Sequence, residues 1–321
     1  MRILILHDKP DDFKLWLNQV TAGHQLFWAR EPSEVQPALE QAQPEVVLSI
    51  KHSDFPGESH RRALLWPTVK WFHVGGSGTD HLGAWDPSRV RVSNSVGCLA
   101  PFHAERAMAA LLCLSTGMRT LNQQQSERTW SPTRFETLQG KTMVIVGLGR
   151  TGTELAQRAK AFGMTVWAVR KSWSQVQPSG RAWDAGYPVS ALADIWPEAD
   201  VLSLNVPLTP ETHHLLGPSE IASLPAHCLL LNGSRGAVID NQALLESLHR
   251  DHLGGVWLDV TEREPLPTDS PLWSHPKVLL TPHCADQVHD FPLRFAKLFH
   301  HNLVRYENGE ELVNVVTPAG S

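Results

Sequence analysis

The sequence predicts an α/β protein with two doubly wound parallel-sheet domains joined by interdomain helices. Three observations support this fold class. Short apolar segments alternate with polar, helix-compatible stretches in two separate series, one within residues 1–100 and one within 141–283. A long helical pattern, 101–119, stands between the two series, and a G-x-G-x-x-G triplet occurs in the second series. Alternation of this kind is typical of parallel sheets with helices on their faces.

The first series contains four predicted strands, at 2–7, 45–50, 69–74 and 90–95. Polar, helix-compatible segments lie between them. The pattern 101–119 is rich in alanine and leucine and opens at Pro101, and proline is favoured in the first turn of a helix. The polar stretch that follows, 122–140, is predicted to be a loop that crosses the surface.

The second series contains six predicted strands, at 141–149, 164–170, 199–207, 227–234, 254–260 and 277–283. Six strands with helices between most of them predict a complete doubly wound sheet. A last helical pattern covers about 286–307. This helix and the one at 101–119 are expected to pass between the two domains.

The composition indicates an ordinary globular protein and excludes several classes. Hydrophobic residues make up 42% and charged residues 19% of the 321 residues. The net charge of −5 argues against nucleic acid as a partner, which would favour a basic surface. No apolar run approaches the roughly 18 residues of a membrane span. Four scattered cysteines without a CxxC pair are expected to be reduced, so we expect a cytoplasmic protein.

The segment "MVIVGLGRTGTELAQRAKAFG" places the glycine triplet after an apolar strand and at the start of an amphipathic helix. That context indicates a dinucleotide-binding loop. Gly147 would permit the tight turn, Gly149 would let a pyrophosphate approach the backbone, and Gly152 would allow close helix–strand packing. Free N–H groups at the helix start favour the anion. The predicted cofactor residues of this loop are Gly147, Gly149, Arg150, Thr151 and Gly152.

The residues at the end of the next strand indicate whether the cofactor is NAD(H) or NADP(H). NAD sites carry an acidic residue about 20 residues after the glycine loop, which accepts from the ribose 2′-OH. This sequence has Arg170, Lys171 and Ser172 there, with no acid. Arginine and lysine attract a 2′-phosphate, so NADP(H) is favoured, with NAD(H) left open. The alternative for these residues is a solvated basic loop.

Three later predicted strands are each followed by an ionisable residue: Arg235, Glu264 and His283. Open α/β sheets bind ligands at the carboxyl ends of their strands. Arginine suits a carboxylate, histidine can protonate a carbonyl oxygen, and a glutamate beside the histidine would favour its imidazolium and fix the ring. Alone, each has a structural alternative: a helix C-terminus for the arginine, a surface turn for the glutamate, the core for the histidine. Together they indicate reduction of a 2-keto acid.

The segments "NGSRGAVID", "LDVTEREPLPTDSPLW" and "TPH" resemble signature segments of the D-isomer-specific 2-hydroxyacid dehydrogenases. The stretch "RKSWSQVQ" is similar to NADPH-preferring glyoxylate/hydroxypyruvate reductases of that family. The resemblance implies that Arg235 binds the substrate carboxylate and carbonyl, and that His283 is the acid/base with Glu264 as its partner. It also implies that Asp259 holds the nicotinamide carboxamide.

The first domain carries part of the resemblance. "WFHVGGSGTDHL" is similar to the family's substrate loop, in which N–H groups around Gly75, Gly76 and Ser77 would cradle the carboxylate. Lys51 and His52 lie where the family varies its substrate contacts. The resemblance therefore implies a flavodoxin-like substrate-binding domain, 1–100 plus 287–321, and a dinucleotide-binding Rossmann domain, 101–286.

The expected function is hydride transfer between NADPH and a small 2-keto acid, with glyoxylate or hydroxypyruvate as substrate, in a homodimer that binds neither membrane nor nucleic acid. One alternative is an NAD(P)H-sensing, corepressor-like interaction protein on the same scaffold. Another is a sister enzyme that oxidises phosphoglycerate, formate or phosphite. Trp130 and Trp273 are interpreted as packing residues, with a place in the substrate wall as the alternative. No metal site is expected, because His213–His214 and His300–His301 lack ligand spacing.

Overall fold

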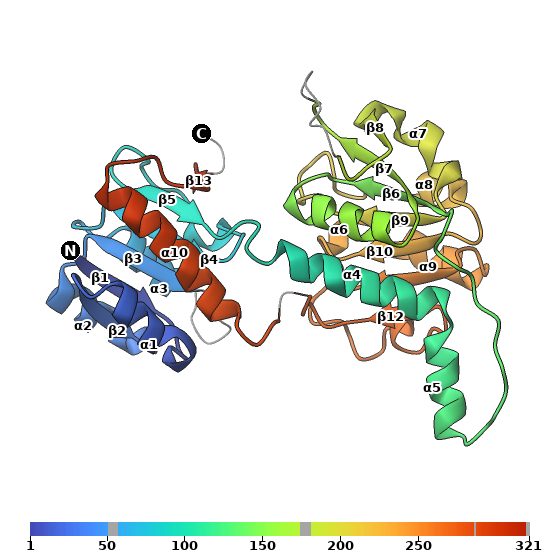
Figure 1. Ribbon diagram of the computed structural model, residues 1–321, viewed down its shortest axis with the longest axis horizontal. Coiled ribbons are helices and arrows are strands. Elements are labelled where there is room, and N and C mark those ends of the chain that lie inside the picture. The colour runs from blue at the N-terminus through green and yellow to red at the C-terminus, as the bar shows by residue number, and fades with distance from the viewer. Residues whose placement is uncertain (51–56, 174–180, 286, 319–321) are drawn as a thin grey trace. The chain divides into compact units, whose positions relative to one another are not determined.

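The computed structural model describes residues 1–50, 57–173, 181–285 and 287–318 (Figure 1). The chain folds into two compact units. Unit 1 consists of Met1–Leu99 and Val288–Ser321, and unit 2 consists of Ala100–Gln287. The chain therefore leaves unit 1, builds the whole of unit 2, and returns to finish unit 1.

Unit 1 contains a six-stranded sheet in the order β13-β5-β4-β3-β1-β2. The strands are β1 (Arg2–Leu6), β2 (Gln25–Ala29), β3 (Val46–Ile50), β4 (Trp71–Gly75), β5 (Arg91–Asn94) and β13 (Val315–Val316). The five strands β1 to β5 are parallel and follow the flavodoxin-like order, which confirms the predicted fold class. The prediction missed β2, whose residues are mostly half-exposed, and the two-residue β13, which pairs antiparallel with β5.

Helices cover the sheet of unit 1. They are α1 (Asp11–Val20), α2 (Pro32–Ala42), α3 (Gly57–Leu64) and α10 (Phe291–Glu307). Figure 1 shows α10 lying along the sheet, and it packs against α1, β3 and β4. The rings of Phe299 and Tyr306 stack on the buried Trp71 of β4, with centroids 5.1 and 5.4 Å away. The predicted helix 286–307 begins later than expected, at Phe291, because Pro292 stands in its first turn.

Unit 2 contains a seven-stranded parallel sheet in the order β12-β11-β10-β9-β6-β7-β8. The strands are β6 (Thr142–Val146), β7 (Thr165–Arg170), β8 (Ala185–Pro188), β9 (Val201–Leu204), β10 (Leu229–Asn232), β11 (Gly255–Leu258) and β12 (Val278–Leu280). All six predicted strands are confirmed. The strand order reverses between β6 and β9, as in a doubly wound dinucleotide-binding sheet. The missed strand, β8, has the sequence AGYP and lies half-exposed at the sheet edge.

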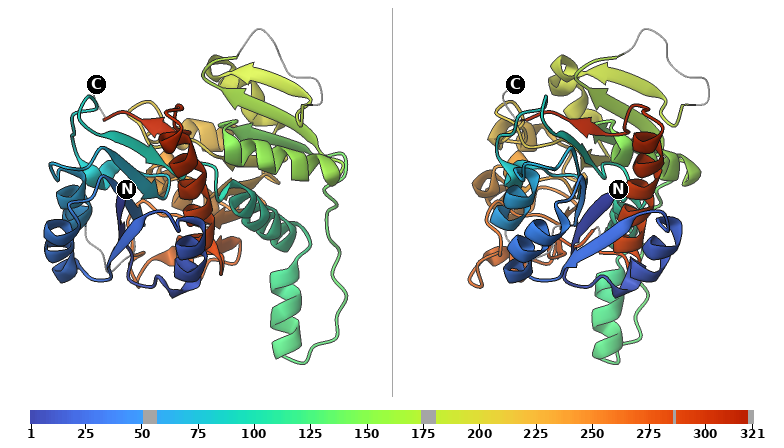
Figure 2. Two further views of the ribbon diagram at one scale, coloured as in Figure 1. Left: turned by 60° about the vertical axis from the view of Figure 1, so that its left-hand side comes forward. Right: turned by 90° about the vertical axis from the view of Figure 1, so that its left-hand side faces the viewer.

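The main helices of unit 2 are α4 (Ala100–Ser115), α5 (Met118–Ser126), α6 (Arg150–Ala161), α7 (Leu192–Ile195), α8 (Pro218–Ser223) and α9 (Asn241–His249). The predicted helix 101–119 is wrong at its end, because Gly117 has φ of 66° and divides it. The predicted loop 122–140 is also wrong over its first residues, which continue α5. Figure 2 shows α5 and the extended chain after it projecting from the rest of the unit.

The apolar faces of the unit 2 sheet are covered on both sides. One core cluster lies between the sheet and the helices α7, α8 and α9, and the other lies under α4 and α6. Because the central strands β9, β10 and β11 are parallel and covered on both faces, the polar loops gather at the two ends of the strands. Among the described residues, every helix is too short or too polar to span a lipid bilayer.

Candidate active site

The strands β10, β11 and β12 are parallel neighbours in the unit 2 sheet. Arg235 follows β10, Glu264 follows β11 and His283 follows β12. The prediction that these three residues lie past the carboxyl ends of parallel strands is confirmed, and the structure adds that the three strands are neighbours. The buried, apolar strands bring three loops together at one edge, so residues far apart in the sequence can serve one site.

His283 and Glu264 form a pair. The Nδ1 atom of His283 lies 2.7 Å from Oε2 of Glu264, and the other carboxylate oxygen accepts a hydrogen bond from the Thr261 N–H at 3.1 Å. The carboxylate therefore holds Nδ1 of the ring and leaves Nε2 as the atom that can exchange a proton with a ligand. His283 has φ of 48°, a backbone conformation that few non-glycine residues adopt.

Asp259 holds the segment that carries His283. Its buried carboxylate accepts from the Thr281 hydroxyl at 2.5 Å and from the N–H groups of Cys284 and Ala285 at 3.1 and 3.0 Å. Its backbone carbonyl accepts from the N–H of His283 at 2.7 Å. Asp259 thus fixes the loop on both sides of the histidine. Thr281 was not predicted as a site residue, and its only signal in the sequence is its place directly before Pro282.

A cavity of about 420 Å³ opens beside this pair. Its lining residues are Asp259, Thr261, Glu264, Pro265, Leu266, Trp273, Leu280, Thr281, Pro282 and His283. Trp273 is exposed and donates its indole N–H to the Pro267 carbonyl at 2.9 Å. Polar and titratable groups therefore meet an apolar wall of leucine, proline and tryptophan. Trp130, in contrast, is fully exposed and lines a different cavity, beside α5.

The loop that carries Arg235 is held by Asn232, a buried residue that the sequence argument missed. The Asn232 side chain donates to the Arg235 carbonyl at 3.0 Å and accepts from the N–H and hydroxyl of Ser234 at 3.1 and 2.7 Å. The Arg235 side chain is exposed, and no carboxylate among the described residues pairs with it. Its guanidinium therefore forms no ion pair with another described residue and can bind a ligand carboxylate. Arg235 is not among the residues that line the cavity of His283.

The glycine triplet has the geometry that its spacing predicts. Gly147 has φ of 98°, and a side chain there would meet the Asn205 carbonyl. A Cβ on Gly152 would lie closer than 3.0 Å to the Gly147 carbonyl, whereas the space around Gly149 is open. Gly149 directly precedes α6, whose first residues are Arg150, Thr151 and Gly152. The N–H groups of this first turn can therefore face an anion over an open glycine.

The basic residues at the end of β7 lie on the surface. Arg170, Lys171 and Ser172 are all exposed. The Arg170 guanidinium lies over the ring of Trp173, 5.5 Å from its centroid, and the Trp173 indole donates to the Tyr187 carbonyl at 2.9 Å. Trp173 therefore gives Arg170 a fixed aromatic surface. The residues 174–180 that follow lie outside the described part of the chain.

The loop Gly75–Ser77 belongs to unit 1. Gly75 ends β4 and packs closely against Ile50, which leaves no room for a side chain. The N–H of Ser95 and the side-chain amide of Asn94 donate to the carbonyls of Gly76 and Ser77, both at 2.8 Å. Those two carbonyls are thus held by β5 and the turn after it. Lys51 and His52 lie outside the described residues.

Comparisons with known proteins agree with this architecture. Residues 108–285 match the model of the D-isomer specific 2-hydroxyacid dehydrogenase NAD-binding domain. The chain is 34% identical to glyoxylate/hydroxypyruvate reductase B of Klebsiella pneumoniae, with 98% of each chain covered.

Two solved structures share the whole fold. A D-isomer specific 2-hydroxyacid dehydrogenase family protein from Aeromonas salmonicida has a TM-score of 0.85 at 28% identity, and 98% of each chain is covered. A D-isomer specific 2-hydroxyacid dehydrogenase from Xanthobacter autotrophicus, solved with NADPH and MES, has a TM-score of 0.78 at 25% identity, again over 98% of each chain. The fold, the nucleotide-binding sheet and these matches lead to one conclusion: the chain belongs to the D-isomer specific 2-hydroxyacid dehydrogenase family.

Proposed function

We propose that this protein is an NADPH-preferring reductase of small 2-keto acids, with glyoxylate and hydroxypyruvate as its substrates. The observation that carries the proposal is the His283–Glu264 pair, 2.7 Å apart at the carboxyl edge of the nucleotide-binding sheet. A histidine with one ring nitrogen held by a carboxylate is suited to general acid catalysis through its other nitrogen. The Klebsiella relative is named for the same two keto acids.

In this proposal, His283 protonates the substrate oxygen. Its Nε2–H donates to the keto oxygen, and the Glu264 carboxylate stabilises the imidazolium before the proton leaves. Bound NADPH supplies the hydride that forms the new C–H bond. The proton from His283 and the hydride together convert the carbonyl to a hydroxyl, and solvent returns a proton to the ring.

Arg235 binds the substrate carboxylate, because its exposed guanidinium offers a planar fork that matches two carboxylate oxygens. The unit 1 loop of Gly75, Gly76 and Ser77 supplies further backbone contacts to the same group. Asp259 is assigned to the nicotinamide carboxamide, in addition to fixing the His283 loop. Contacts to both oxygens of the carboxylate fix the orientation of the substrate, so its keto carbon faces the hydride donor.

The cofactor preference rests on charge at the end of β7. Arg170 and Lys171 are exposed there, and Ser172 adds a hydroxyl, so the end of β7 offers two cations to a 2′-phosphate and carries no acidic residue among positions 170–173. The Xanthobacter neighbour was solved with NADPH. Gly147, Gly149, Arg150, Thr151 and Gly152 receive the pyrophosphate. NADH remains the weaker alternative.

The proposal includes a cytoplasmic homodimer. The helix α5 buries none of its residues, and Met118, Trp130 and Phe135 expose large apolar side chains on this projecting arm. Exposed apolar surface of this kind marks an association site. No disulfide joins any of the cysteines in the described residues, Cys98, Cys113, Cys228 and Cys284, as a reducing compartment favours. Sedimentation should give twice the 35.7 kDa chain mass, and a monomer would contradict the dimer.

One assay tests the reaction and the cofactor together. The purified protein is mixed with glyoxylate, hydroxypyruvate or pyruvate and with NADPH or NADH, and the loss of nicotinamide absorbance is followed. We expect the fastest turnover with NADPH and the two polar keto acids. The Arg170→Ala variant should lose kcat/KM with NADPH and keep it with NADH. A wild-type preference for NADH would overturn the cofactor assignment, and cofactor binding without turnover of any keto acid would favour the sensing protein.

A further inference from the structure

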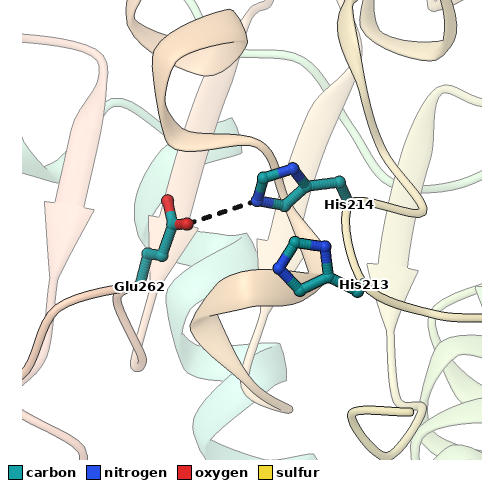
Figure 3. Close-up of side chains that lie close together, drawn as sticks. All are labelled: His213, His214 and Glu262. Atoms are coloured by element: carbon teal, nitrogen blue, oxygen red, sulfur yellow. Dashed lines mark hydrogen bonds and ion pairs between the residues drawn. The ribbon is translucent and has the colours of Figure 1, made fainter. Parts of the chain in front are cut away.

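A second group of chemistry-bearing side chains lies outside the cavity of His283. It consists of His213, His214 and Glu262, whose ligand atoms all lie within 4.8 Å of one another (Figure 3). The His214 Nε2 atom is 3.2 Å from Oε1 of Glu262. His213 and Glu262 are exposed and His214 is half-exposed, so an ion from solvent can reach the group.

The backbone around His214 brings the two adjacent histidines together. Neighbouring residues in an extended chain point to opposite sides, but His214 has φ of 50°. As a result the two imidazoles stack, with centroids 3.9 Å apart. The His214 N–H donates to the Ala237 carbonyl at 2.8 Å, which holds this unusual conformation in place.

Glu262 is supplied by another loop. The Gly236 backbone lies so close to Thr261 and Glu262 that any Cβ on Gly236 would overlap them. The segment after β10 therefore contacts both loops. Ala237 accepts a hydrogen bond from the His214 loop, and Gly236 packs against the Glu262 loop. The histidine pair shows no ligand spacing in the sequence, because the third member of the group stands 48 residues beyond His214.

We propose that His213, His214 and Glu262 form a binding site for a divalent transition-metal ion of the zinc class. Two imidazoles and one carboxylate are donors that Zn²⁺ takes readily, with a fourth position left to water. Ligand atoms about 2.1 Å from a tetrahedral zinc lie about 3.4 Å apart. The His214–Glu262 pair has nearly this spacing already, at 3.2 Å. The exposed side chains of His213 and Glu262 can rotate to close the remaining distances.

The surroundings of His214 support the assignment. Its other ring nitrogen, Nδ1, lies 3.8 Å from Oδ2 of Asp240. Asp240 is itself fixed, because its Oδ1 accepts from the Ala243 N–H at the start of α9. A carboxylate beside the second nitrogen of a metal-bound histidine orients the ring and strengthens the ligand. The ion would join the loop before α8 to the loop after β11 and so stabilise unit 2.

The test uses the full-length, tag-free protein and ZnCl₂ alone, with binding measured by competition against a chromophoric zinc indicator. Three variants remove one ligand each: His213→Ala, His214→Asn and Glu262→Gln. Asparagine is chosen at 214 because it tolerates positive φ. His301→Ala is the matched control, since this exposed histidine also belongs to an adjacent pair.

We expect the wild type and His301→Ala to bind one zinc ion that each ligand variant loses. The loss in affinity should exceed the roughly 10–100-fold effect of removing an outer partner of a metal ligand. A tenfold excess of zinc over its dissociation constant should also raise the unfolding midpoint of the wild type by about 3 °C. Equal binding by wild type and the three ligand variants would overturn the site, and so would a wild type that binds no zinc. None of these readouts depends on the proposed activity.

Discussion

His73 of β4 is a buried histidine whose protonation should control the acid stability of unit 1. Its side chain is completely buried, and its two ring nitrogens lie 2.8 and 3.1 Å from the hydroxyls of Ser93 and Ser95. The Trp71 indole also donates to Ser93 at 2.9 Å. Burial lowers the pKa of His73 from 6.5 to about 3. The His73 imidazole is therefore neutral in folded unit 1 at any pH well above 3.

The size of the effect follows from this pKa. Between pH 6.5 and about 3 the unfolded chain binds a proton that the folded chain excludes, so stability is lost as the pH falls. Each pH unit in that window removes about 1.4 kcal/mol from the free energy of unfolding. At pH 5.0, about 1.5 units below the ordinary value, the loss is about 2 kcal/mol, whereas at pH 7.5 it is close to zero.

The perturbation is His73→Gln, which removes the titrating group and keeps a polar side chain. The variant loses a constant amount at all pH values, but its stability relative to wild type should improve by about 2 kcal/mol between pH 7.5 and 5.0. Urea titrations at both pH values measure this difference, with hydrogen exchange of β4 peptides reporting on unit 1 alone. His301→Gln, an exposed site, is the control. A stability gap between wild type and His73→Gln that is the same at both pH values would refute the reasoning.

Two further predictions concern unit 2. Glu264→Gln should lower kcat by about 10²–10⁴-fold while NADPH still binds, because an amide cannot stabilise the His283 imidazolium. Steady-state kinetics measure kcat, and fluorescence titration measures the binding of NADPH. An unchanged kcat would contradict the role of Glu264. Gly152→Ala should weaken both NADPH binding and thermal stability, because its Cβ would overlap the Gly147 carbonyl. Gly149→Ala, where the structure leaves open space, is the matched control for stability, and equal melting temperatures would contradict the packing argument.

The sequence predicted the parts of the fold that are buried. The six predicted strands of unit 2 are short apolar segments, so their positions and their order could be predicted from the sequence. The strand ends in turn predicted where Arg235, Glu264 and His283 lie. The strand β2 was missed because its side chains are mostly half-exposed. Helix α5 was missed because it is strongly polar, with Met118 and Leu121 as its only apolar residues, and because it buries none of its side chains.

The supporting residues of the site were beyond a sequence argument. Asn232 and Thr281 act through hydrogen bonds whose partners are set by the path of a loop, which no residue pattern encodes. The same holds for the His213, His214 and Glu262 group, which depends on one residue with positive φ and on a close approach at Gly236. Loop conformation is decided by the packed elements around it, so it becomes visible only in three dimensions.

The division of unit 1 between the two ends of the chain has a consequence for synthesis on the ribosome. Residues Met1–Leu99 emerge first, but α10, which stacks Phe299 and Tyr306 on Trp71, is translated only after all of unit 2. At 5–20 residues per second, the interval between residues 99 and 288 lasts about 10–40 s. During that time one face of the nascent sheet has no helix to cover Trp71. Chaperones would meet this protein at that face, and unit 2 would be the first part to reach its final fold.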